Sequence, residues 1–140
     1  MTIQRFFDYI FYRVTDSYIN KWKDEQGMIY GVGVVSVMQI THIMFILLVF
    51  ALFFNNVNDI FFKQREGFNF MHSGIIYPCL IVLAYNFFRY FKFFSFERAK
   101  KQWVDEEKES RRKNGKHIVF YIVLNLGITI FLSIYRRYIL

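Results

Sequence analysis

The sequence predicts an all-α integral membrane protein with three transmembrane helices and two amphipathic helices, cytoplasmic or interfacial. Three stretches, residues 26–58, 67–88 and 117–135, carry no charged side chain. Each reaches the ~18–20 residues that a helix needs to cross the hydrocarbon core of a bilayer. In addition, 55% of the 140 residues are apolar and 22% are aromatic, which excludes an ordinary water-soluble enzyme. One membrane domain, residues 1–140, therefore accounts for the chain.

Residues 3–22 are predicted to form the first amphipathic helix. Apolar side chains recur there every three or four residues on one face, and the opposite face is polar, with Asp8 and Tyr12 among its members. We interpret this helix as an interfacial anchor that leads into the first span. A helix that docks a partner or senses lipid is the alternative.

The distribution of cations predicts the orientation of the spans. The first span is expected at 28–54, the outer loop at 55–72, the second span at 73–94 and the third at 118–135. If all three cross, the four Lys and Arg before the first span and the ten in residues 89–117 lie on one side, against four on the other. Positive residues favour the cytoplasmic side, so we expect a multi-pass protein of the cell (inner) membrane with its N-terminus cytoplasmic and its C-terminus outside. Arg136 and Arg137 oppose this orientation but are outnumbered.

A second amphipathic helix is predicted at 96–113, after a bend in the chain. If the second span continued straight, it would project ~28 Å beyond the membrane. The few residues left before the third span could return only ~14 Å. The chain must therefore bend near 93–95, with Ser95 as the N-cap of the new helix and Gly115 as its stop.

Three side chains are predicted to be interfacial anchors. Trp22 and Trp103 belong to the two amphipathic helices, where an aromatic ring suits the headgroup layer. Arg89 lies close to the cytoplasmic end of the second span, from which its guanidinium can extend to the interface.

Polar side chains within the spans are costly in lipid and therefore mark contacts between helices or functional positions. Gln39, Asn86 and Asn125 come from three different spans at similar depths, so we expect a shared layer of hydrogen-bonded amides. Thr129 continues a row of polar residues four apart on the third span. The alternatives are a water-lined path in which His42 titrates, and a ligand site.

The sequence contains no pattern that points to catalysis, a metal or a cofactor. Its three histidines are dispersed, its cysteine is single, and no glycine-rich phosphate loop occurs. Because the cations flank apolar runs, nucleic acid is not an expected partner. We expect a small non-enzymatic accessory or assembly subunit, with the lipid bilayer and a larger membrane protein, or further copies of itself, as partners. The alternatives are a homo-oligomeric pore or membrane-disrupting effector, and a membrane-embedded lipid-modifying enzyme.

Overall fold

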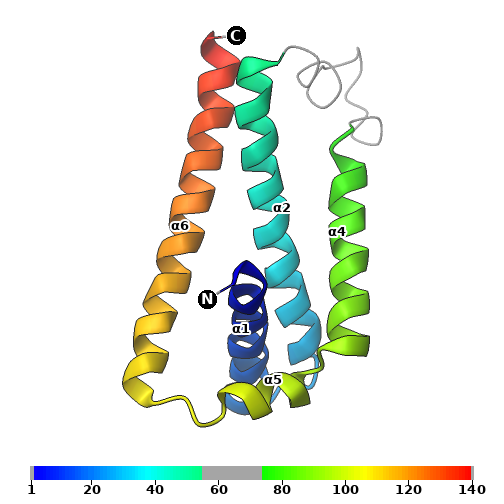
Figure 1. Ribbon diagram of the computed structural model, residues 1–140, viewed down its shortest axis with the longest axis vertical. Coiled ribbons are helices and arrows are strands. Elements are labelled where there is room, and N and C mark those ends of the chain that lie inside the picture. The colour runs from blue at the N-terminus through cyan, green and yellow to red at the C-terminus, as the bar shows by residue number, and fades with distance from the viewer. Residues whose placement is uncertain (1, 55–73, 140) are drawn as a thin grey trace.

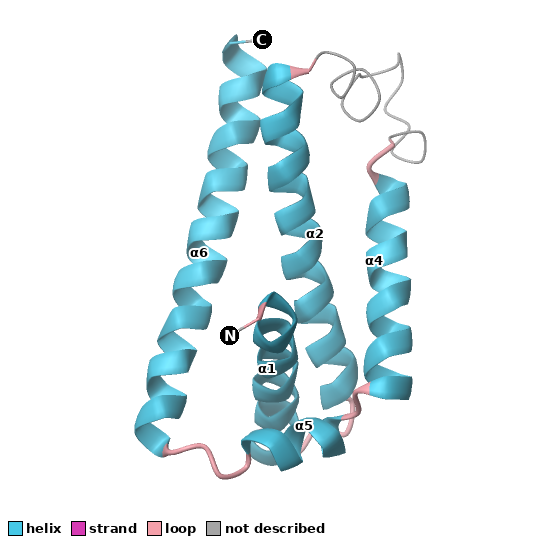
Figure 2. Cartoon of the chain, viewed as in Figure 1, coloured by secondary structure: helices cyan, strands magenta, loops and turns pink. Residues whose placement is uncertain are grey.

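The computed structural model describes residues 2–54 and 74–139, which form helices joined by short connections. In chain order these are α1 (Ile3–Asp16), the π-helical turn η1 (Ser17–Lys21), α2 (Gly27–Phe53), α4 (Ile76–Phe88), the π-helical turn η3 (Arg89–Phe93), α5 (Phe96–Trp103) and α6 (Lys108–Ile139). The described residues contain no strand, as Figure 2 shows, and the all-α prediction is confirmed. The outer loop predicted at 55–72 and the first residue of the predicted second span lie outside the described residues.

Two helices are long and apolar enough to cross a membrane. These are α2 and the apolar part of α6, with mean hydropathies of 2.3 and 2.2. A third span exists if the bent pair Ile76–Phe93 and Phe96–Trp103, whose axes differ by 71°, is taken as one unit. The chain therefore has two or three helices suited to a bilayer, as expected of a membrane protein.

Helix α2 is central, with α4 on one side and α6 on the other (Figure 1). We call the end that holds α5 and the start of α6 the base of the molecule, and the end that holds the C-terminus its top. Helices α2 and α6 converge toward the top and diverge toward the base, where α1 packs. The described helices therefore form a helical bundle that is wider at its base.

Helix α1 begins at the residue that the sequence predicted. The Thr2 hydroxyl accepts a hydrogen bond from the Arg5 backbone N–H at 3.4 Å and so caps the first turn. The amphipathic pattern correctly predicts the helix, but Asp8 and Tyr12 on its polar face are buried. Neighbouring helices cover both faces of α1 in its middle, so this part does not lie as an anchor with one face in water.

The main hydrophobic core lies at the base, around α1. It is rich in aromatic rings and combines side chains of α1, the first half of α2, η3 and α5: Phe7, Tyr9, Ile10, Phe11, Tyr12, Val32, Val35, Met38, Tyr90, Phe96, Ala99 and Trp103. The backbones of α1 and α2 approach closely at Gly31, where an added Cβ would lie 2.9 Å from Phe11 Cδ2. The absence of a side chain at Gly31 therefore permits the crossing of these two helices.

The predicted bend is confirmed, and the prediction for the next helix is wrong. Phe94 and Ser95 leave the helical conformation, and Ser95 is the N-cap of α5. Helix α5, however, ends at Trp103, and α6 then runs without interruption through Gly115. The chain reverses at residues 104–107, upstream of the predicted stop. Gly115 does not end α6, because an isolated glycine costs a helix only about 1 kcal/mol.

Candidate functional site

A polar cluster joins α2 to α4 inside the protein. Asn86 is fully buried, and its Nδ2 donates to Ser36 Oγ at 3.1 Å and to Gln39 Oε1 at 2.9 Å. The structure thus brings together two of the three amides for which the sequence predicted a layer. Hydrogen bonds of this kind contribute about 0.6–2 kcal/mol each in a membrane and fix the register of the two helices.

A second polar cluster joins α2 to α6. The Tyr121 hydroxyl and His42 Nδ1 are hydrogen-bonded at 3.1 Å, and Asn125 Nδ2 donates to the Tyr121 oxygen at 3.3 Å. Asn125 therefore does not join Gln39 and Asn86, because α6 and α4 lie on different sides of α2. The Thr129 hydroxyl donates to its own helix, at the Asn125 carbonyl, so it makes no contact with α2 through this bond.

A cavity of about 330 Å³ opens beside the His42–Tyr121 pair. Its lining combines the first two turns of α1 with one side chain each from α2 and α6: Thr2, Ile3, Phe6, Phe7, His42 and Tyr121. The Phe6 and Tyr121 rings meet edge to face at 5.1 Å and form one of the contacts between α1 and α6. The volume lies within the range of pockets that hold small ligands. The sequence singled out His42, but it did not predict that α1 would form the opposite wall.

A buried ion pair ties α1 to η3, below the cavity. Arg89 Nη2 donates to both oxygens of Asp8 at 2.9 and 2.8 Å, and the Tyr90 hydroxyl donates to Asp8 Oδ1 at 3.0 Å. Both donors face Asp8 although they are adjacent in sequence, since they lie in the wider turn of η3. The guanidinium predicted to be an interfacial anchor is thus held inside the protein. The sequence offers one signal for this pair, the opposite charges of an acid in the first helix and an arginine at the end of a span.

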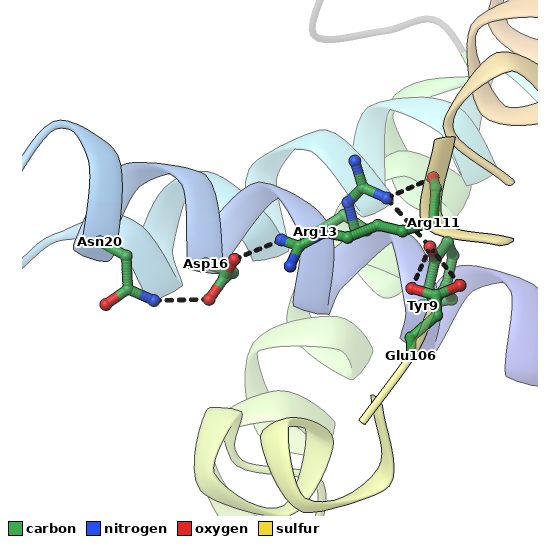
Figure 3. Close-up of polar contacts among 6 residues, drawn as sticks. All are labelled: Tyr9, Arg13, Asp16, Asn20, Glu106 and Arg111. Carbon is green, nitrogen blue, oxygen red and sulfur yellow. Dashed lines mark hydrogen bonds and ion pairs between the residues drawn. The ribbon is translucent and has the colours of Figure 1, made fainter. Parts of the chain in front are cut away.

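A third set of polar contacts lies at the base and connects α1 and η1 to the start of α6. Figure 3 shows its six members: Tyr9, Arg13, Asp16, Asn20, Glu106 and Arg111. The Tyr9 hydroxyl donates to Glu106 Oε2 at 2.7 Å, and Arg111 pairs with Asp16 at 2.6 Å. Burial raises the pKa of the Tyr9 phenol above its usual value, and its hydrogen bond to Glu106 acts in the same direction. Tyr9 is therefore a neutral donor at physiological pH.

The two tryptophans predicted to be anchors occupy different environments. Trp22 is exposed at the end of η1, with its ring against Tyr18 at 4.9 Å. Trp103 is only 9% exposed and packs between Tyr9 and Tyr12, at 5.5 and 5.7 Å. The prediction for Trp103 is therefore corrected, because the aromatic rings of α1 cover the face that would have met the headgroups.

The comparisons find no match. Neither protein family models, nor curated proteins, nor solved structures gave a similar protein. Within residues 2–54 and 74–139, no group of three His, Cys, Asp or Glu side chains could hold a metal ion. The polar groups described above form hydrogen bonds that position the helices, and the candidate site consists of the cavity, its His42–Tyr121 pair and the exposed face of α6.

Proposed function

We propose that this protein is a small non-enzymatic accessory subunit that binds a larger membrane protein through α6. The observation that carries the proposal is the exposure of that helix: no residue in the most apolar part of α6 is buried, compared with 28% in the corresponding part of α2. Its outward face is formed by large apolar side chains, among them Val119, Phe120, Val123, Leu124, Ile130 and Phe131.

The base of α6, in contrast, is firmly attached. Arg111 pairs with Asp16, and the Arg111 backbone carbonyl accepts a hydrogen bond from Arg13 at 2.8 Å. Asn114 donates to Glu106 at 2.7 Å. A helix that is fixed at one end and exposed along its apolar length is suited to presenting that length to a partner. Van der Waals packing drives helix association in lipid, and a small residue such as Gly127 lets the two backbones approach closely.

The orientation belongs to the same proposal. With three spans in the cell (inner) membrane, the base lies in the cytoplasm and the top faces outside. The concentration of cations in residues 1–25 and 89–117 supports this orientation, because positive residues favour the cytoplasmic side. The described parts of both ranges lie at the base or lead to it (Figure 1).

Two glycines provide a matched test of the binding face. Gly127 lies in the apolar part of α6 and Gly33 lies near the start of α2, and a Cβ at either position would meet no atom within 4 Å. Gly127→Leu and Gly33→Leu should therefore both fold. On purification in mild detergent, the wild type and Gly33→Leu should retain one larger protein stoichiometrically. Gly127→Leu should retain about tenfold less, as a loss of ~1.4 kcal/mol produces.

Two results would overturn the proposal. The first is equal recovery of the partner with both glycine variants, which would place the interface elsewhere. The second is recovery of the protein only as a closed homo-oligomer that conducts ions in planar bilayers. That outcome would favour the pore.

A further inference from the structure

We infer that the cavity between α1, α2 and α6 is a binding site for one phospholipid, whose ester oxygen accepts a hydrogen bond from His42. This inference goes beyond the proposed partner and does not depend on it. The cavity lies between the helices, whereas the proposed partner contacts the outward face of α6. Three features of the site support the inference, namely the depth of the cavity, the hydrogen bonds of His42 and the apolar lining.

The depth is set by α6. Its uncharged run, residues 117–135, is about 28 Å long as a helix and matches the hydrocarbon thickness of a bilayer. Tyr121 lies four residues into this run, so it is ~6 Å inside the hydrocarbon edge on the side of the base. The surroundings of the cavity at this level are therefore the upper parts of acyl chains and the glycerol esters that join them to the headgroups.

The hydrogen bonds are satisfied by one tautomer of His42. The Tyr121 oxygen accepts from Asn125, and among the described residues His42 Nδ1 is the one group that can accept the Tyr121 hydroxyl proton, which it does in the tautomer that leaves Nδ1 unprotonated. A neutral imidazole that accepts at Nδ1 carries its proton on Nε2. In the described residues, no protein acceptor lies within hydrogen-bond distance of Nε2, and the side chain is exposed. An exposed N–H donor in this layer of a membrane favours an occupant that supplies an acceptor oxygen.

The lining identifies the rest of the occupant. Ile3, Phe6 and Phe7 form an apolar wall, and a cavity of about 330 Å³ has room for part of one acyl chain. The ester carbonyl of a diacyl phospholipid combines the two required properties, since it is an acceptor attached directly to an apolar chain. Binding should consequently depend on the ester and the chain more than on the charge of the headgroup.

Native mass spectrometry of the full chain in detergent tests the inference with a matched lipid pair. The probes are dioleoyl phosphatidylglycerol and its diether analogue, which has the same headgroup and chain length but no carbonyl. The wild type should bind one diester molecule about five- to tenfold more tightly than the diether, as one hydrogen bond provides. His42→Phe should bind the two probes equally.

Two tryptophan variants test the location. Ile3 lines the cavity and is 77% exposed, and Ile134 is 52% exposed in the upper part of α6, so a larger side chain at either position leaves the core intact. Ile3→Trp should fill the cavity and reduce binding of the diester at least tenfold, whereas Ile134→Trp should bind as the wild type does. The site would be refuted if the wild type bound diester and diether with equal affinity, or if the two tryptophan variants bound the diester equally. Either result would indicate the nonspecific lipid binding that any membrane protein shows.

Discussion

The substitution Asp8→Leu should be severely destabilising, because it leaves the buried Tyr90 hydroxyl and the partly exposed Arg89 guanidinium without their acceptor. The Asp8 side chain is 9% exposed and that of its partner Arg89 is 22% exposed. Removal of one member of a buried ion pair costs about 3–5 kcal/mol, which the partial exposure of Arg89 reduces to about 2–3. The fully buried Tyr90 hydroxyl also loses its acceptor, at about 1–3 kcal/mol. We therefore expect a loss of about 3–6 kcal/mol in the free energy of unfolding.

Asp16→Leu is the matched control on the same helix. Asp16 also pairs with an arginine, but the side chains of Asp16 and Arg111 are 14% and 38% exposed. Solvent screens a pair of this kind, so the expected loss is about 1 kcal/mol or less. The double variant Asp8→Leu with Arg89→Met should recover at least half of the stability that Asp8→Leu loses, because it removes the uncompensated charge.

Thermal unfolding in detergent micelles measures these differences. The chain has two tryptophans, and in a Trp22→Phe background the fluorescence of Trp103 reports on the core around α1. At about 3–4 °C per kcal/mol, Asp8→Leu should lower Tm by roughly 10 °C or more, and Asp16→Leu by less than about 4 °C. Equal shifts for the two variants, or a double variant no more stable than Asp8→Leu, would refute the assignment of a buried, charge-dependent contact.

Two further predictions concern packing and topology. Gly31→Ala should destabilise by about 1–2 kcal/mol in the same unfolding assay, since its Cβ would overlap with Phe11. Gly33→Ala, whose Cβ would lie in open space, should stabilise slightly. If Gly33→Ala were less stable than Gly31→Ala, the close crossing of α1 and α2 would be contradicted. A reporter enzyme fused after Leu140 should be active outside the cell, and one inserted after Asp105 should be active in the cytoplasm. Activity on the opposite sides would refute the proposed orientation.

The helices and the bend could be predicted because their causes are local. Uncharged runs mark α2 and α6, and the spacing of apolar residues marks α1. The bend near Ser95 follows from chain length alone. The reversal at residues 104–107 could not be predicted, because these residues include no proline or glycine. Contacts distant in sequence accompany it, such as that of Glu106 with Tyr9.

The candidate site could be predicted only in part. Similar depth along the helices correctly predicted that Gln39 and Asn86 meet. Depth does not indicate on which side of α2 a neighbouring helix lies, so Asn125 was assigned to the wrong cluster. Likewise, the periodicity of α1 separates an apolar face from a polar one. It does not reveal that Arg89, 81 residues away, covers part of the polar face.

The position of α1 in the core determines when this helix can pack during synthesis of the chain. Helix α1 leaves the ribosome before α5 does, yet its packing partners include Tyr90, Phe96 and Trp103. Until translation passes Trp103, the aromatic side chains of α1 have no complete core, and Asp8 has no counter-charge before Arg89 is added. The core around α1 is thus complete only after the chain has been synthesised as far as Trp103. A product that terminates before Trp103 would leave apolar side chains of α1 exposed to chaperones and proteases.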